Sequence, residues 1–299
     1  MSQTPTLRQL HYFLALVEHS HFGRAAEACF VSQSAFSHAI REMEDALGTQ
    51  LVDRTNRSVT ITNTGKDIAV QARLVLQDVE TLVDTARATT APLSGRLTLG
   101  SIPTIAPYLL PRALPKLRKA HPDLQLYLRE GQSEHIVQEL HDGNIDVILL
   151  ALPYPMRNVT TLELFDDPFH LAYRRGTRLI DPKNFQVNRL NADSVLLLEE
   201  GHCLRDHALS ACKIASRDSV NNFAASSLAT LVEMVRADLG VTFIPEMAIR
   251  AGSLKGTGIS TLPMPKGNLR KIGLGWRKGS GREAEFRLLG KLLQQEWAN

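Results

Sequence analysis

Cysteine is scarce in this chain, which holds only 3 in 299 residues. An odd number of cysteines, together with an N-terminal stretch, MSQTPTLRQLHYFLALVEHS, that lacks the pattern of a secretion signal, argues against a framework of structural disulfides. We therefore expect a cytoplasmic protein in a reducing compartment. The missing export pattern also argues against an exported solute-binding protein.

Long apolar runs and an excess of one charge are also missing. No run approaches the roughly 18 apolar residues of a transmembrane helix, so we expect no membrane contact. Residues 1–90 hold 8 basic and 10 acidic residues and residues 91–299 hold 26 and 21, so any nucleic-acid site must depend on local placement of charge. The length favours about two domains, each with its own core. No cofactor and no metal site are predicted.

Two of the three cysteines fall in one segment, GHCLRDHALSAC, residues 201–212. Cys203 has His202 and Arg205 as neighbours, and a thiol among cations is biased toward the thiolate that peroxide attacks. The segment predicts a helix, along which the nine residues to Cys212 correspond to a rise of about 13 Å and roughly half a turn of rotation. A disulfide between them would require this helix to unwind. The alternative is that both cysteines are buried structural residues.

The first 62 residues predict a helical module followed by a hairpin. Thr6 is expected to cap a first helix, a second helix is expected over 23–29, and a third from the cap Ser32 to about Leu47, ended by Gly48. A short helix, a tight turn and a capped helix with a polar N-terminal stripe are typical of a helix-turn-helix that enters the major groove. The stripe consists of Ser34, Ser37, His38 and Arg41. The alternative is a merely solvated helix face.

Two further patterns extend this module. LVDRTNRSVTIT, residues 51–62, predicts a hairpin wing whose Arg54 and Arg57 suit phosphate or minor-groove contacts. Over 63–94, apolar residues then recur at alternating spacings of four and three, which favours a two-helix coiled coil and hence a dimer over an intramolecular helix. These residues are Ile68, Ala72, Val75, Val79, Leu82 and Ala86. A hinge is expected over 89–95.

From residue 95 onward, short apolar runs alternate with amphipathic stretches. The runs include RLTLG, LQLYLREG, IDVILLAL, FHLAYRRG, SVLLLEEG, GVTFIPE and KIGLGWRKG. Such alternation predicts an α/β fold with a mainly parallel sheet covered by helices. A last helix is expected over about 282–297.

The segment AAEACFVSQSAFSHAIREMEDALGTQLVDR, residues 25–54, resembles the DNA-binding signature of LysR-type transcription regulators. The paired alanines, Ser32-Gln33, Glu44 and the later Thr62-x-x-Gly65 fall in register. Modest departures are Val52, Met43 and Cys29, the last expected to pack in the core.

This resemblance implies a winged helix-turn-helix at 1–62, a linker helix and hinge at 63–94 and a regulatory domain at 95–299. The regulatory domain would have two lobes around a cleft, as in periplasmic binding proteins: lobe I over 95–167 and 271–299, and lobe II over 168–270. The implied partners are double-stranded promoter DNA, a second copy in a homodimer that assembles to a homotetramer, and RNA polymerase. The implied DNA contacts are Ser32, Gln33, Ser34, Ser37, His38, Arg41, Arg54 and Arg57.

Segments of the regulatory domain resemble the peroxide-sensing members of that family. They are SIPTIAPYLLP at 101–111, LFDDP at 164–168, LEEGHCLRDHALSAC at 198–212 and SSLATLVEMVRADLGVTFIP at 226–245. The resemblance implies that Cys203 reacts with hydrogen peroxide, that Cys212 resolves it into a disulfide and that a thiol reductant resets it. The implied neighbours of the reactive thiol are Thr104, Ser133, His202, Arg205, Asp206 and Arg270. Ser133 and Asn222 depart from the usual Thr and His.

Three functions are therefore open. The first is a redox-responsive regulator of antioxidant genes whose oligomer changes geometry on DNA. The second is a LysR-type regulator that binds a small molecule in the interlobe cleft, with structural cysteines. The third is a peroxidase-like thiol enzyme, but a helix-turn-helix has no place in such a protein, so we expect no enzyme.

Overall fold

The structure, a computed structural model, describes residues 4–54, 59–86, 92–186, 190, 194–211 and 224–298. The expectations for Arg57, Cys212 and Asn222 lie outside this part of the chain. The chain divides into two compact units, one made of residues up to 90 and one of nearly all the rest. No helix in the described ranges is long and apolar enough to cross a bilayer.

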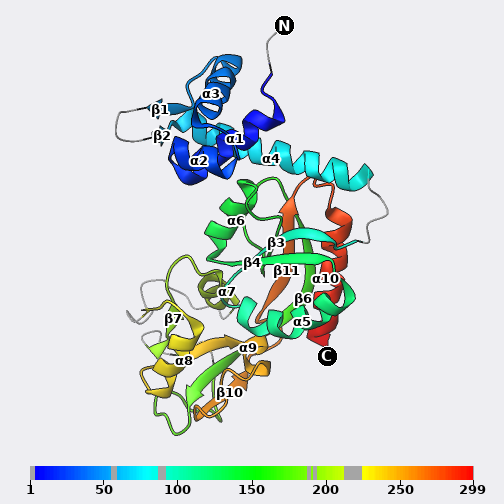
Figure 1. Cartoon of the computed structure of the whole chain (residues 1–299). Helices are drawn as coiled ribbons and strands as arrows, with labels where there is room; N and C mark the ends of the chain where they lie inside the picture. Colours follow the sequence, from blue (N-terminus) through cyan, green and yellow to red (C-terminus); the bar gives the residue numbers. More distant parts are fainter. Residues whose placement is uncertain are drawn as a thin grey trace. The chain divides into compact units, whose positions relative to one another are not determined.

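The first unit is a helical module with a two-stranded wing (Figure 1). Its elements are α1 (Leu7–His19), α2 (Phe22–Ala28), α3 (Gln33–Leu47), β1 (Val52–Arg54), β2 (Val59–Ile61) and α4 (Asn63–Ala86). Two of these helices begin at the predicted caps. The Thr6 hydroxyl accepts a hydrogen bond from Gln9 N–H at the start of α1, and the Ser32 hydroxyl accepts one from Ala35 N–H at the start of α3. Gly48 ends α3 with a φ of 65°. Cys29 is half-buried against the core of this unit.

The wing is joined to the helices by the residues that the signature sets in register. The Glu44 carboxylate accepts hydrogen bonds from the backbone N–H groups of Leu51 and Val52, at 2.9 and 3.1 Å. The Thr62 hydroxyl accepts one from Gly65 N–H at 2.9 Å. A Cβ on Gly65 would lie 2.3 Å from the Leu51 carbonyl oxygen, so only glycine allows α4 to start this close to the wing.

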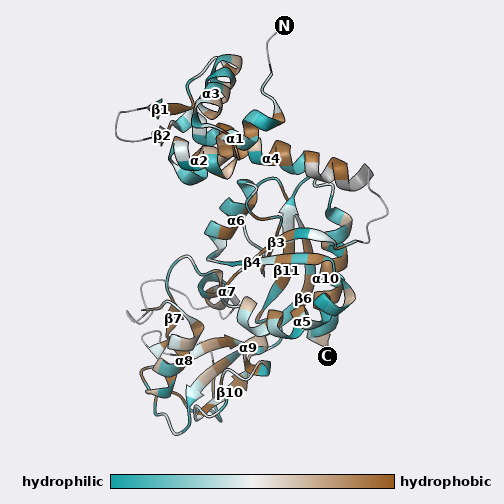
Figure 2. Ribbon diagram, viewed as in Figure 1, coloured by the Kyte–Doolittle hydropathy of each residue, from teal (hydrophilic) through white to brown (hydrophobic). Residues whose placement is uncertain are grey.

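The long helix α4 carries the predicted heptad positions. Along it, hydrophilic and hydrophobic residues alternate (Figure 2). Ala72 is buried, whereas Val75 and Leu82 are 44% and 68% exposed. Large apolar side chains exposed on a helix at heptad spacing are expected where a second helix packs.

The second unit has two hydrophobic cores, each belonging to one lobe. Lobe I contains α5 (Ala106–Ala120), α6 (Ser133–His141) and α10 (Glu283–Ala298) with strands β3 (Gly95–Ser101), β4 (Leu124–Glu130) and β5 (Val147–Leu152). Lobe II contains α7 (Cys203–Ala211), α8 (Leu228–Arg236) and α9 (Glu246–Arg250) with β7 (Leu197–Leu198), β8 (Ala224–Ala225), β9 (Thr242–Pro245) and β10 (Ile259–Pro263). Two long strands, β6 (Val159–Arg174) and β11 (Leu269–Arg277), connect them.

The expectation of a mainly parallel sheet is wrong. The strand order is β10-β6-β11-β5-β3-β4, with β9 also on β6. The pairs β3–β4 and β3–β5 are parallel, but β11 is antiparallel to both β5 and β6, and β9 and β10 are antiparallel to β6. The physical reason is that β6 takes the chain into lobe II and β11 brings it back, so the two neighbouring crossover strands must run in opposite directions.

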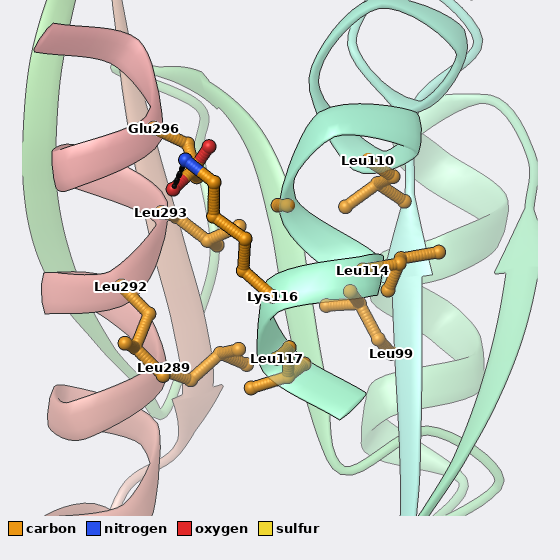
Figure 3. A pocket seen from close by; sticks show the side chains of 10 residues that line it. Leu99, Leu110, Leu114, Lys116, Leu117, Leu289, Leu292, Leu293 and Glu296 are labelled. Atoms are coloured by element: carbon orange, nitrogen blue, oxygen red, sulfur yellow. Dashed lines mark ion pairs between the residues drawn. The ribbon is translucent and has the colours of Figure 1, made fainter. Parts of the chain in front are cut away.

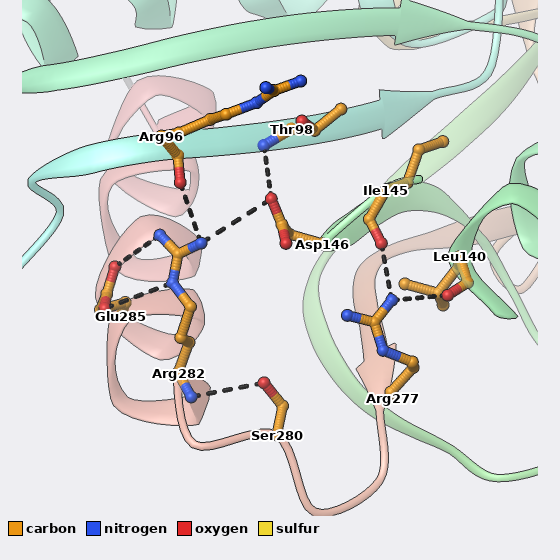
Figure 4. A network of polar contacts seen from close by, with 9 residues as sticks. All are labelled: Arg96, Thr98, Leu140, Ile145, Asp146, Arg277, Ser280, Arg282 and Glu285. Atoms are coloured by element: carbon orange, nitrogen blue, oxygen red, sulfur yellow. Dashed lines mark hydrogen bonds and ion pairs between the residues drawn. The ribbon is translucent and has the colours of Figure 1, made fainter. Parts of the chain in front are cut away.

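The last helix returns to lobe I and packs on α5 and β11. Its first turn is fixed by Arg282, whose guanidinium donates to the Arg96 carbonyl oxygen at 3.0 Å and pairs with Glu285 and Asp146 (Figure 4). Further along, leucines of α5 and α10 line an apolar pocket bounded by the Lys116–Glu296 ion pair at 2.8 Å (Figure 3). None of the expected site residues lines this pocket.

Candidate functional site

The polar N-terminal stripe of α3 lies on the surface. Ser32, Gln33, Ser34, His38 and Arg41 are exposed, and Ser37 is half-buried. His38 lies 3.3 Å from the Glu42 carboxylate, one turn further along the helix. The opposite face is buried through Phe36, Ile40 and Met43. The helix is thus fixed by its apolar face and presents donors and acceptors of the kind that contact base edges and phosphates.

Of the two arginines predicted in the wing, only Arg54 lies in the described part of the chain. Asp53 and Arg54 pair with Thr60 and Val59 in the antiparallel β1–β2 ladder. The backbone of Arg54 therefore lies in the pair of this ladder that is furthest from the helices.

The predicted reactive thiol lies at a different kind of position. Cys203 opens α7 and is only 4% exposed. It belongs to the lobe I core, whereas Leu204, Ala208 and Leu209 of the same helix belong to the lobe II core. Helix α7 therefore spans the boundary between the lobes, and Cys203 is the residue by which it enters lobe I.

Arg270 is the cation of this buried region. It is 1% exposed, and its guanidinium donates to the Thr104 hydroxyl and carbonyl oxygens, both at 2.9 Å. It also pairs with the fully buried Asp167 carboxylate at 3.0 Å. Asp167 is its direct cross-strand neighbour in the β6–β11 ladder, and its other oxygen accepts a hydrogen bond from Met247 N–H at 2.9 Å. Arg270 thus fixes Thr104 and brings positive charge near the thiol without leaving an unpaired buried ion.

Burial raises the pKa of the Cys203 thiol, while the Ser133 hydroxyl, the Arg270 guanidinium and the Ala151 backbone oppose this effect. The expectation that this thiol is biased toward thiolate is therefore wrong for the reduced state described here. The physical reason is that the site is dry, and desolvation disfavours the charged form more strongly than the nearby groups favour it.

The sequence neighbours His202 and Arg205 do not supply a positive charge to the Cys203 thiol either. Burial lowers the pKa of the His202 imidazole, with the Glu199 carboxylate opposing this, so His202 is favoured as the neutral form. The Arg205 guanidinium donates to the Leu198 carbonyl oxygen at 3.1 Å. Asp206 is exposed in the first turn of α7, and its carboxylate raises the pKa of Cys203 slightly further.

Ser133 and Thr104 bring two side-chain hydroxyls to the surroundings of Cys203. Both are buried and line a narrow recess with Cys203, no part of which is wide enough to hold a water molecule. The other lining residues are Ile102, Pro103, Gln132, His202 and Leu204. Within the described ranges the Ser133 hydroxyl forms no hydrogen bond of ordinary geometry, but it lies close enough to the Cys203 sulfur to lower the pKa of the thiol. A Cys203 thiolate or a small oxygen compound would give it an acceptor.

Three residues of this region were not singled out from the sequence. Gly201 has a φ of 91°, and a Cβ there would lie 2.6 Å from the Gln132 amide oxygen, so the turn before Cys203 requires glycine. Asp167 was within a recognised motif, but its pairing with Arg270 spans 103 residues of chain. His207 had a signal, because a residue four positions after Cys203 lies on the same helix face. Its imidazole Nε2 is 3.2 Å from the Pro153 carbonyl oxygen.

Family models cover almost the whole chain. Residues 7–66 match the bacterial regulatory helix-turn-helix protein family, lysR type, and residues 90–298 match the LysR substrate binding domain. The fold and both matches define a DNA-binding transcription regulator, and the chain belongs to the LysR family.

Individual relatives are similar to this chain over nearly its full length. The regulator EstR of Acinetobacter baylyi is 39% identical over 296 residues, covering 99% of this chain and 98% of its own. The dual regulator OxyR of Escherichia coli is 38% identical over 289 residues, covering 96% and 94%. Among solved structures, a full-length OxyR variant from Pseudomonas aeruginosa superimposes with a TM-score of 0.82 at 32% identity, covering 98% of this chain and 95% of its own. The chain is thus similar to OxyR over nearly its full length.

Proposed function

We propose that this protein senses hydrogen peroxide through Cys203 and controls antioxidant genes by changing its oligomer geometry on promoter DNA. The observation that carries the proposal is the set of polar groups that surround this buried thiol. A structural cysteine needs only apolar packing, whereas Cys203 has Arg270, Thr104 and Ser133 around it. Several relatives of similar length are named hydrogen peroxide-inducible genes activators, which supports the same signal.

The chemistry takes place in two steps. The Cys203 sulfur attacks one peroxide oxygen, the O–O bond breaks, and water leaves after proton transfer, so that the thiol becomes a sulfenic acid. The Cys212 thiol then gives up its proton and attacks that sulfur, the S–O bond breaks, and the departing hydroxide takes up that proton and leaves as a second water while the disulfide forms. The two thiols lose two electrons and peroxide gains them. A cellular thiol reductant returns both electrons and resets the protein.

Each neighbour has a distinct part in the first step. Thr104, which is held by Arg270, and Ser133 would donate hydrogen bonds to peroxide oxygens or to the thiolate, and their position beside Cys203 supports this role. The Arg270 charge and the N-terminal position of Cys203 on α7 favour the developing negative charge. Because the recess has no room for a water molecule and burial disfavours thiolate, we expect peroxide to enter through a small local opening that also wets the sulfur.

The first unit would bind the promoter DNA. Ser32, Gln33, Ser34, Ser37, His38 and Arg41 would contact the major groove, and Arg54 and Arg57 the flanking backbone or minor groove. Two such modules would be paired through the α4 seam, and two dimers would form the tetramer that meets RNA polymerase. The boundaries 1–62, 63–94 and 95–299, with lobes divided near 167 and 271, belong to the same proposal.

A second candidate is a regulator that binds a small molecule between the lobes, with structural cysteines. The relative EstR favours it, since its name mentions no peroxide and its 39% identity is as high as that of the relatives named for peroxide, which range from 36% to 39%. The raised pKa of Cys203 points the same way.

A footprint on candidate promoter DNA separates the two. We expect the protected region to change length or spacing when reduced protein is treated with peroxide, and the Cys203→Ser variant to keep the reduced footprint. An unchanged footprint for peroxide-treated protein, or a normal peroxide response from Cys203→Ser, would favour the small-molecule regulator.

A further inference from the structure

Helix α7 is held between two hydrophobic cores. Leu204, Ala208 and Leu209 pack in the lobe II core, and Cys203 packs in the lobe I core. His207 is one helical turn after Cys203, so it lies on the same face. This face contacts lobe I, and its contacts must break whenever the first turns of α7 leave that lobe.

Cys203 and His207 contact neighbouring residues of lobe I. The Ala151 backbone, near the end of β5, lies close enough to Cys203 to lower the pKa of its thiol. The His207 Nε2 lies 3.2 Å from the carbonyl oxygen of Pro153, two residues further along. Helix α7 is thus attached to the end of β5 at two points, one by the sulfur and one by the imidazole.

The donor and acceptor of the second contact follow from chemistry. The Pro153 carbonyl only accepts, so the imidazole must carry its proton on Nε2. The other nitrogen, Nδ1, is buried and has no hydrogen-bond partner in the described ranges. The Cys203 carbonyl oxygen lies near the ring and raises its pKa slightly, but no hydrogen bond of ordinary geometry joins it to Nδ1. Burial lowers the pKa of His207 and the Arg270 charge acts in the same direction, while the Pro153 carbonyl, Asp206 and the Cys203 carbonyl oppose them, and the net lowering favours the neutral ring.

We propose that His207 is a positioning residue of the redox switch: its hydrogen bond to Pro153 holds α7 on lobe I and so sets how fast oxidised Cys203 is released toward Cys212. The inference rests on the proposed function. Oxidation adds an oxygen to a sulfur in a recess without room for a water molecule, which weakens the Cys203 attachment. The His207 attachment is untouched by that chemistry, and it must still break before the helix can leave.

The test compares two alanine variants on the same helix. His207→Ala and exposed Ser210→Ala both raise helix propensity, but only the first removes the contact with Pro153. Sulfenic acid formation is measured by dimedone trapping in a Cys212→Ser background, and disulfide formation by quenched-flow alkylation in the otherwise unaltered protein. We expect His207→Ala to speed the disulfide step by about threefold to tenfold, the effect of losing one net hydrogen bond. Ser210→Ala should leave that step unchanged or slow it.

His207→Gln serves as the conservative variant, because its amide can donate to the same carbonyl oxygen. It should restore the disulfide rate to within about twofold of the unaltered protein. Equal rates for His207→Ala and the unaltered protein, or equal acceleration by Ser210→Ala, would overturn the positioning role. If the unaltered protein forms no disulfide at all, the proposed function fails instead, so the two failures are distinct.

Discussion

The helices α3 and α7 both begin with residues of the predicted sites, but those of α3 are exposed whereas Cys203 of α7 is buried. On α3 the polar stripe is exposed and only the opposite face is buried. On α7 the first residue, Cys203, is buried, and its partners Ser133, Ala151 and Arg270 come from three distant segments of the chain. A surface that recognises DNA therefore depends on local sequence, whereas a buried thiol depends on long-range packing that also sets its pKa.

Breaking the buried ion pair should have the largest effect. Arg270→Met leaves the Asp167 carboxylate fully buried without its partner, which costs about 3–5 kcal/mol of unfolding free energy. Urea unfolding of the reduced protein measures it. The neighbouring Lys271→Met removes only the exposed pair with Glu163 and should change stability little. Similar losses from both variants would contradict the distinction between the buried and exposed regions.

The second-largest effect is expected from a substitution at the exposed heptad positions of α4. Leu82→Asp places a charge where a second helix is expected to pack, and dimer affinity should fall by more than about tenfold. Sedimentation equilibrium measures the loss. Lys66→Asp, on the opposite side of the same helix, is the control and should leave the dimer intact. A dimer unaffected by Leu82→Asp would show that the main contact between copies lies elsewhere.

A smaller effect is expected on the exposed helix. Arg41→Ala should weaken DNA binding by about tenfold at physiological salt without lowering stability, because an exposed contact contributes only when DNA is present. Fluorescence anisotropy with promoter DNA and thermal unfolding measure the two quantities. Arg236→Ala, exposed on α8, should bind DNA normally. Loss of stability in Arg41→Ala would show that this side chain is structural.

The smallest effect concerns pH. Burial lowers the pKa of His202 and His207, so below about pH 6.5 the unfolded chain takes up protons that the folded chain does not. The contribution of the two residues is therefore complete above that pH and is lost as pH falls through the lowered values. Urea midpoints at pH 5.5 and 7.5 should differ less in the double variant His202→Gln/His207→Gln than in the unaltered protein. Equal differences would rule out these imidazoles as the cause.

The sequence was most informative where interactions are local. The caps Thr6 and Ser32, the end of α3 at Gly48 and the buried face of α3 follow from residues within a few positions of each other. The long-range features could not be obtained in this way. The antiparallel crossover strands, the Arg270–Asp167 pair and the lowered pKa of His202 depend on which strands become neighbours and on how dry the site is.

The central claim is that Cys203 and Cys212 form a peroxide-driven disulfide, and peptide mass mapping tests it most directly. Reduced protein is treated with a stoichiometric amount of hydrogen peroxide, alkylated and digested without reductant. We expect a peptide pair linked through Cys203 and Cys212 that disappears after thiol reduction and is missing in Cys203→Ser. Recovery of Cys203 only as the free thiol, or only as sulfinic and sulfonic acid, would contradict the account.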